Sequence, residues 1–469
     1  MPRAPIRCNP MSIIPIKTFI LLKSTVLMIL VIIVFWSMPR SRTRSWSRAS
    51  IAETYRNILT GQNKENLIIN RNRDLARRRV EIEVPEDTRQ EPETFQQVNN
   101  YEAWVYSAFF DIDVDAPGQD IVKVFGISSY SRYMVYCYIV EDGLTEIVTG
   151  KRDFISDNHL QNNSAVILFC PLKTGSKPQF VSIAFQRKEP PTNNLTIVYQ
   201  KRNQREMTVC HSVLFNVTDP SQLVQSIEMN RLLGAQHFFI YNHSVTQRAD
   251  RALRHYQKLG LVTVMNWPLP TPHVWYHGQN MAINDCVYRN RGLSTFVAII
   301  DTDEVVVPKN HYSMIEVLHA VDHEVKLTDK MTKKQTIVGS YVFQSTIFTR
   351  RPTFEQWEAI KKQFLITPEE DRFIQEQNVT YLTQLVRIST SSLPMVRSKS
   401  IVRPEHVLVA GIHFTHFHRG KANFTLVNNN LAILHHYKNY EKGRVIELTA
   451  FRFKKKLLTR LKTAYSLMK

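Results

Sequence analysis

Two patterns of apolar and polar positions divide this chain of 469 residues. Between residues 101 and 204, short runs rich in Val, Ile, Tyr and Phe are separated by turn residues, for example at 116–118 and 141–143. This spacing predicts a β-rich module of antiparallel strands, sandwich-like or packed onto the next domain, and no motif within it indicates chemistry. From residue 205 to residue 440, apolar runs alternate with stretches of helical spacing. The fold class expected for this second region is α/β with a mainly parallel sheet.

The α/β region begins with a regular series of elements. The expected strands are 207–215, 237–244, 261–267 and 295–301. The expected helices between them are 221–233, 247–259 and 279–291. No Gly-rich phosphate loop precedes these helices, and the sequence has neither a Walker motif nor a dinucleotide fingerprint. These absences disfavour ATPases and dehydrogenases.

The fourth expected strand ends abruptly in acidic residues. Residues 297–300 lack the alternation of a half-exposed strand, and Asp301, Asp303 and Glu304 follow them. Carboxylates at the end of a buried strand need a cation or a wet cleft, and ligands of open α/β sheets bind at this edge. Two aspartates one residue apart suit a divalent ion shared with a phosphate-bearing ligand. The alternative is a turn in which Asp301 caps a helix and Asp303 is solvated.

Histidines cluster late in the chain. On a strand, His416 and His418 share one face, whereas a shift by one register brings His413 to that face instead. A second cluster is formed by His435 and His436. An imidazole can complete the ligand shell of a divalent ion that carboxylates begin, and the alternative for each histidine is a hydrogen-bonded structural role.

The net charge of +19 is concentrated at the two ends of the chain. Because no zinc-finger spacing or aromatic-interleaved basic motif accompanies it, nucleic acid is not an expected partner. Near the C-terminus, apolar residues at spacings of three or four alternate with Lys and Arg over residues 451–469. This pattern predicts a basic amphipathic helix within the segment 441–469, docked on the body of the protein. The alternative is a helix that lies on a membrane surface.

The N-terminal part has the features of a membrane anchor. Residues 18–38 contain an apolar run that matches the thickness of a bilayer. They are expected to follow a cytosolic tail of residues 1–17 and to precede a polar stem of residues 39–100. A cleaved signal peptide is the alternative, but the long apolar run and the absence of a small-x-small site before Pro39 argue against cleavage.

Sequons and cysteines indicate where the body lies. The charges that flank the anchor are nearly balanced and do not decide the orientation. Six N-x-S/T triplets follow the anchor and begin at Asn162, Asn194, Asn216, Asn242, Asn378 and Asn423. Four cysteines also follow it, and an oxidising lumen permits any of their three pairings. The expected topology is a single-pass anchor with the N-terminus in the cytosol and the body in the secretory lumen.

Several ordered motifs resemble glycosyltransferase family 92, which was long catalogued as a domain of unknown function and is abundant in nematodes. The motifs cover residues 228–270, 277–290, 296–308, 396–414 and 435–438. The resemblance implies a GT-A-like nucleotide-binding fold, a divalent metal such as Mn²⁺, and a UDP-sugar donor. It further implies an enzyme of the Golgi membrane, single-pass type II, with a lumenal catalytic body. It also implies transfer of galactose from UDP-galactose in a β-linkage to a glycan or glycoprotein acceptor.

The same resemblance suggests roles for individual residues. Asp301 and Asp303 match a D-x-D motif with Glu304 beside them, and His413 matches a late histidine, so the implied metal ligands are Asp301, Asp303 and His413. His436 and Lys438 match a His-Tyr-Arg/Lys motif and are implied to bind the donor together with the acidic residues. Lys438 stands where Arg is common, which puts a bidentate contact with the diphosphate in doubt.

An inverting transfer also needs a general base. The candidates are Glu355 and Glu358, beside Trp357, whose indole suits a sugar ring. Exposed helix carboxylates are the alternative reading of both residues. Two other functions remain open at this point: a catalytically silent glycan-binding or scaffold protein with the same fold, and a basic membrane protein that faces the cytosol.

Overall fold

A computed structural model describes residues 94–112, 119–200, 204–438 and 443–467. The expected tail 1–17 and anchor 18–38, and nearly all of the stem 39–100, lie outside these residues. No helix in the described part of the chain has both the length and the apolar character needed to cross a bilayer. The described residues all belong to one compact unit, residues 84–469.

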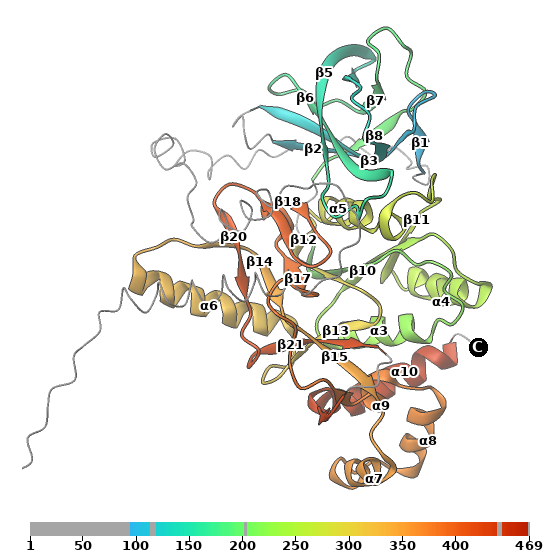
Figure 1. The fold of residues 1–469 in the computed structure, drawn as a ribbon, viewed down its shortest axis with the longest axis vertical. Helices are drawn as coiled ribbons and strands as arrows, with labels where there is room; N and C mark the ends of the chain where they lie inside the picture. The colour runs from blue at the N-terminus through green and yellow to red at the C-terminus, as the bar shows by residue number, and fades with distance from the viewer. Residues whose placement is uncertain (1–93, 113–118, 201–203, 439–442, 468–469) are drawn as a thin grey trace, which may run out of the picture. The chain divides into compact units, whose positions relative to one another are not determined.

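The first part of this unit is a β module, drawn in blue to green in Figure 1. Its strands are β1 (Gln96–Gln97), β2 (Ala103–Ile112), β3 (Asp120–Ser129), β4 (Val135–Glu141), β5 (Leu144–Phe154), β6 (Asn163–Pro171), β7 (Phe180–Ala184) and β8 (Leu195–Val198). They form one sheet in the order β1-β2-β3-β6-β5-β4-β7-β8. Since β8 also pairs with β2, the sheet closes on itself. The module is therefore a closed sheet rather than an open sandwich, and of the two arrangements that the sequence pattern predicts, packing onto the next domain is the one observed.

The disulfide Cys137–Cys170 links β4 to β6 inside this module, with 5.9 Å between the Cα atoms. Strands β2 and β3 are buried on both faces, whereas β5 is largely exposed. The difference arises because one outer face of the module packs against the α/β region, and β5 lies away from that contact. The module is thus fastened to the rest of the unit by the apolar outer faces of β2 and β3.

The α/β region is built on a seven-stranded sheet in the order β11-β10-β9-β12-β17-β14-β20. Its strands are β9 (Arg205–His211), β10 (His237–Asn242), β11 (Val262–Asn266), β12 (Ser294–Ile300), β14 (Ile337–Phe343), β17 (Lys399–Val402) and β20 (Ala422–Leu426). The first four in that order pair in parallel, whereas β17 is antiparallel to both of its neighbours. The four strands expected from the sequence are confirmed, and the architecture is mixed α/β.

Helices cover both faces of this sheet. They are α3 (Ser221–Leu232), α4 (Gln247–Lys258), α5 (Gln279–Arg289) and α6 (Met314–Thr332). One apolar core contains side chains of α3, α4 and α6, and a second core contains α5 together with β2 and β3 of the module. A disulfide between Cys210 of β9 and Cys286 of α5 lies in the second core. Helix α5 is therefore enclosed between the sheet and the β module.

A second sheet follows in the order β13-β21-β15-β16-β22. Its strands are β13 (Glu304–Pro308), β15 (Ser345–Arg350), β16 (Val386–Arg387), β21 (Ala432–Tyr437) and β22 (Val445–Ile446). Helices α7 (Phe354–Gln363), α8 (Pro368–Glu376) and α9 (Thr380–Thr383) lie between β15 and β16 in the chain. Strands β18 (Val407–Ala410) and β19 (Thr415–His418) form a separate hairpin. The one-turn helices are η1 (Trp275–Gly278), η2 (Pro404–His406) and η3 (Thr449–Phe453).

A buried ionic network joins the β module to the α/β region. Asp111 of β2 contacts Lys123 at 2.8 Å, Arg291 at 2.6 Å and Arg419 at 3.0 Å. Burial alone would raise the pKa of Asp111, but the three cations hold it well below its ordinary value. Because the carboxylate stays ionised at neutral pH, it fixes the contact between the two parts of the unit.

The C-terminal helix α10 (Lys454–Leu467) is docked on the body, as its apolar spacing predicts. Its apolar side chains Leu457, Leu458 and Leu461 lie in the same core as those of α3. Ion pairs from Lys454 and Lys462 to the first turn of α8 add polar contacts. The alternative, a helix held only by a membrane surface, does not fit this burial.

Candidate functional site

The acidic residues of the D-x-D sequence lie where β12 ends and β13 begins. Asp301, Thr302 and Asp303 form the short connection, and Glu304 is the first residue of β13. The side chains of Asp301 and Asp303 are 25% and 27% exposed, whereas that of Glu304 is 2% exposed. The chain therefore leaves the carboxyl end of a buried parallel strand and turns into the second sheet, with two carboxylates facing solvent and one buried.

A buried lysine provides the counter-charge for two of these carboxylates. The ammonium of Lys399, at the start of β17, lies 2.8 Å from Asp301 and 3.4 Å from Glu304, and its side chain is 1% exposed. Burial alone would lower the pKa of Lys399, but the two carboxylates hold it above its ordinary value. Burial alone would likewise raise the pKa of Asp301, and Lys399 holds it below its usual range. Both groups are thus charged at neutral pH.

Asp301 has further polar partners. The side-chain amide of Gln279, the first residue of α5, donates to Asp301 Oδ1 at 2.9 Å. Ser212, which follows β9, also hydrogen bonds to this carboxylate. Three segments of the chain therefore hold Asp301 in one orientation, which makes it a positioned anchor rather than a free acid.

Glu304 and Asp303 face opposite sides of one imidazole. His436 of β21 stands directly opposite Glu304 in the antiparallel pair of β13 and β21. Its Nδ1 lies 3.4 Å from Glu304 Oε1, and its Nε2 lies 3.4 Å from Asp303 Oδ2. Neither ring nitrogen has a hydrogen-bond partner of good geometry among the described residues. Burial raises the pKa of Glu304 to about 7, so this acid is partly protonated at neutral pH.

His413 lies in the turn between β18 and β19, near enough to Asp301 for the two groups to interact electrostatically. Its Nδ1 is 3.2 Å from the carbonyl oxygen of Ser398, so Nδ1 is the donor and Nε2 keeps its lone pair. Burial lowers the pKa of His413, as does the nearby charge of Lys399, so the ring is neutral at pH 7. Metal-ligating histidines show this arrangement, in which one ring nitrogen donates to a carbonyl and the other binds.

The carboxylates and imidazoles of this cluster are of the kinds that bind a divalent cation, but they do not form a complete site. No group of three or more His, Cys, Asp or Glu in the part of the chain that the structure describes is close enough to hold a metal ion by itself. Asp303 offers an accessible oxygen donor, and the ring nitrogens of His436 beside it lack a hydrogen-bond partner among the described residues. The charge of Asp301 is already balanced by Lys399, so Asp303 is the more available of the two aspartates. Such a set needs an additional ligand, such as a diphosphate, to complete it.

The remaining candidates differ in how close they lie to this cluster. Lys438 follows β21 and is exposed, and its backbone amide donates to Phe348. His416 contacts Asp157 of the β module at 3.1 Å, and His418 contacts Ser340 at 2.9 Å. His416 and His418 thus contact other residues, whereas the charge of Asp301 acts on His413.

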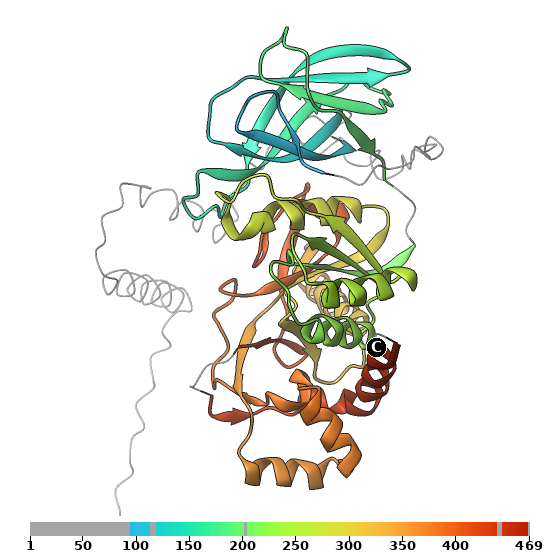
Figure 2. The same ribbon diagram turned by 90° about the vertical axis from the view of Figure 1, so that its right-hand side faces the viewer.

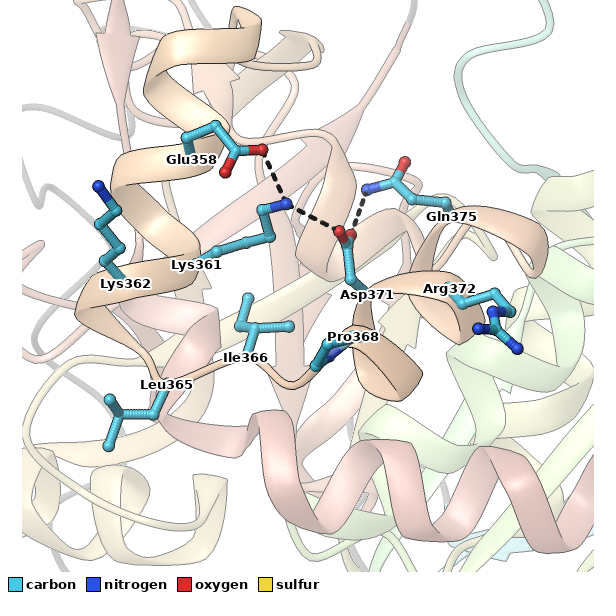
Figure 3. A pocket seen from close by; sticks show the side chains of 9 residues that line it. All are labelled: Glu358, Lys361, Lys362, Leu365, Ile366, Pro368, Asp371, Arg372 and Gln375. Atoms are coloured by element: carbon cyan, nitrogen blue, oxygen red, sulfur yellow. Dashed lines mark hydrogen bonds and ion pairs between the residues drawn. The ribbon is translucent and has the colours of Figure 1, made fainter.

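The structure does not bring Glu355 and Glu358 to the acidic cluster. Both lie on α7, and Figures 1 and 2 show α7 and α8 together at one end of the α/β region. Glu358 pairs with Lys361 at 2.7 Å, and Lys361 also contacts Asp371 of α8 at 3.0 Å. Figure 3 shows these side chains lining an open groove of about 600 Å³ between the two helices. The expectation that these acids serve as the base finds no geometric support, because the segment from β15 to β16 carries them away from the strand ends.

The sequence reading missed Lys399, Gln279 and Ser212. Gln279 and Lys399 lie inside stretches that resemble family 92, but nothing in their local pattern marks them as partners of a carboxylate 22 and 98 residues away. A lysine in an otherwise apolar strand, as in residues 399–402, is the one signal that points to a buried ion pair.

Comparison with known proteins adds a family to this geometry. The model of glycosyltransferase family 92 matches residues 205–466, which is more than half of the chain. The chain belongs to glycosyltransferase family 92. The matched region begins at β9 and ends within α10, so it contains every residue of the acidic cluster and excludes the β module.

Two relatives come from Caenorhabditis elegans. Beta-1,4-galactosyltransferase galt-1 is 27% identical over 251 residues, which cover 49% of this chain and 57% of that protein. A second family 92 protein is 26% identical over 152 residues, or 29% of this chain and 30% of that protein. The chain thus spans little more than half the length of the first relative.

Among solved structures, the chain is similar to glucosyl-3-phosphoglycerate synthase from Mycobacterium tuberculosis in complex with Mn²⁺, UDP and glucosyl-3-phosphoglycerate. That similarity has 11% identity and a TM-score of 0.22, and it covers 55% of this chain and 80% of that one.

Proposed function

We propose that this chain is a metal-dependent glycosyltransferase that transfers galactose from UDP-galactose, in a β-linkage, to a glycan acceptor. The observation that carries the proposal is the acidic cluster at the carboxyl end of β12, inside the region that belongs to family 92. Support for the donor comes from galt-1, whose name is that of a β-1,4-galactosyltransferase. The α/β sheet is proposed to be GT-A-like on the same grounds.

The charges of the cluster suit a cation and a diphosphate. Asp303 and His413 are the residues proposed to hold Mn²⁺, with Asp301 oriented behind them by Lys399 and Gln279. When bound, the ion would neutralise the charge of the departing UDP. Lys399 keeps Asp301 ionised, and His436 lies between Asp303 and the buried Glu304. Burial and the charges of Asp301 and Asp303 raise the pKa of Glu304, which reduces the negative charge at this edge.

The proposed setting is the lumenal side of Golgi membranes. Asn162, Asn194, Asn216 and Asn423 are exposed and accessible to glycosylation, and both disulfides suit an oxidising compartment. The predicted anchor, residues 18–38, would hold the body at the membrane surface. This setting would also bring glycan acceptors on secretory proteins to the site.

The decisive experiment measures UDP release by the full chain with a panel of UDP-sugars, in the presence of Mn²⁺ or of a chelator. We expect release from UDP-galactose with Mn²⁺ and its loss with the chelator. Asp303→Asn should lower turnover by about 10²-fold, because it removes a charge that acts on the leaving group. The matched control, Asp250→Asn on α4, should retain wild-type turnover. Wild-type turnover by Asp303→Asn would refute the metal assignment, and absence of release from every donor would favour a silent glycan-binding protein.

A further inference from the structure

One loop of the β module reaches the edge of the acidic cluster. The segment between β5 and β6, residues 155–162, lies beside the start of α5 and the β18–β19 hairpin (Figure 1). Ser156 Oγ is 2.9 Å from His416 Nδ1, and Asp157 Oδ2 is 3.1 Å from His416 Nε2. The side-chain amide of Asn280 donates to the carbonyl oxygens of Ser156 and Asp157. The module therefore contributes residues to this edge, although it lies outside the family 92 match.

The loop also meets the turn that leads into α5. The imidazole of His159 stacks on the indole of Trp275, with 4.0 Å between ring centroids and 29° between planes. Tyr276 follows Trp275, and three residues later Gln279 donates to Asp301. The β module thus contacts the turn that leads into Gln279, which holds Asp301.

Both segments have backbone conformations that side chains disfavour. Asp157, His159 and Leu160 have φ values of 70°, 49° and 64°. Tyr276 and His277 have φ values of 44° and 57°, directly before Gly278 at 77°. Such conformations concentrate at ligand sites. Two large side chains in these segments, Leu160 and Tyr276, are 76% and 57% exposed.

An additional polar atom at this edge has no partner. Asn280 is 6% exposed, and its Oδ1 has no hydrogen-bond partner among the described residues. Asp157 keeps 46% of its side chain exposed while it pairs with His416. An accessible carboxylate and an exposed aromatic ring on two adjoining segments suit a sugar, since a ring can pack on the apolar face of a pyranose and a carboxylate can accept from its hydroxyls.

We propose that the loop of residues 156–160 and the turn of residues 275–278 together form the acceptor-binding edge of the site. In this arrangement the ring of Tyr276 packs against a sugar of the acceptor glycan, and Asp157 accepts hydrogen bonds from its hydroxyls. The donor lies on the Asp301 side of the same turn. The β module is thereby part of the substrate-binding surface, and this inference rests on the proposed function.

The test compares acceptor and donor kinetics in the full chain. Tyr276→Ala and Asp157→Asn should each raise the KM for p-nitrophenyl glycoside acceptors by at least tenfold. The KM for UDP-galactose and the slow UDP release without acceptor should stay within twofold of wild type. Two controls have similar exposure: Tyr312→Ala, at a residue that is 66% exposed, and Asp153→Asn, at the exposed end of β5. Both controls should leave every parameter unchanged.

Each outcome is informative. A raised KM for UDP-galactose with an unchanged KM for the acceptor would overturn the proposal, because the turn would then belong to the donor site. Unchanged kinetics in both variants would overturn it as well. Binding of the labelled full chain to a glycan array tests the inference without turnover. Binding that Tyr276→Ala abolishes supports the acceptor edge even if no donor releases UDP, whereas absence of binding by the wild type overturns it.

Discussion

Replacing Lys399 by Met tests the electrostatic account of the acidic cluster. The change keeps an unbranched side chain of similar length in a position that is 1% exposed, and it removes the cation between Asp301 and Glu304. At an effective dielectric constant of about 20, the ammonium interacts with Asp301 by about 6 kcal/mol and with an ionised Glu304 by about 5 kcal/mol. Desolvation of the lysine offsets much of this attraction. The expected net loss of unfolding free energy is about 3–5 kcal/mol, the usual cost of removing one partner of a buried pair.

The loss should depend on pH, because Glu304 titrates near neutrality. Its pKa of about 7 in the folded protein exceeds the value of about 4.3 in the unfolded chain. A raised pKa contributes stability at low pH that is lost as the pH rises through the folded value. Without Lys399 the folded pKa rises further, so the loss should be larger at pH 8 than at pH 6. Asp301→Asn added to Lys399→Met should recover part of it.

The assay is chemical unfolding of wild type and variants at pH 6 and pH 8. Lys326→Met, at an exposed position of α6, is the matched control and should change stability by less than about 0.5 kcal/mol. Equal stability of Lys399→Met and wild type at both values of pH would refute the reasoning. It would mean that water, rather than the lysine, compensates the carboxylates.

Four further predictions concern the rest of the fold and its setting. Asp111→Asn should destabilise the protein by about 3–5 kcal/mol in chemical unfolding, because it leaves buried cations unpaired, and an unchanged midpoint would contradict this. Deletion of residues 454–469 should lower the melting temperature or abolish folding, since α10 supplies core residues; an unshifted melting temperature would show that the helix is not docked. Burial lowers the pKa of His237 to about 4, so the free energy of unfolding should fall as the pH drops from about 6.5 toward 4. Between pH 6.5 and pH 5, chemical unfolding of His237→Asn should show a loss of unfolding free energy about 1–2 kcal/mol smaller than that of wild type. Removal of N-glycans from protein made in a secretory host should lower its apparent mass, with Asn194 among the occupied sites, and no shift would contradict a lumenal body.

Local periodicity determined the elements of the α/β region. The helices α3, α4 and α5 lie within one or two residues of their expected bounds, and the apolar run before Asp301 forms a strand buried on both faces. These features were accessible because the spacing of apolar residues within one element reflects which face of that element is buried. The D-x-D position at the end of a strand follows from the same pattern.

Tertiary structure alone decided which side chains meet. Lys399 reaches Asp301 across 98 positions of sequence because β17 pairs antiparallel with β12, an order of strands that no local pattern encodes. Packing between distant elements also explains why β8 closes onto β2. It likewise brings Asp157 to His416 from another part of the chain. The spacing of apolar residues determines which face of a helix or strand is buried. The contacts between elements that are distant in sequence depend on how those faces pack, and the chemistry of this site resides in those contacts.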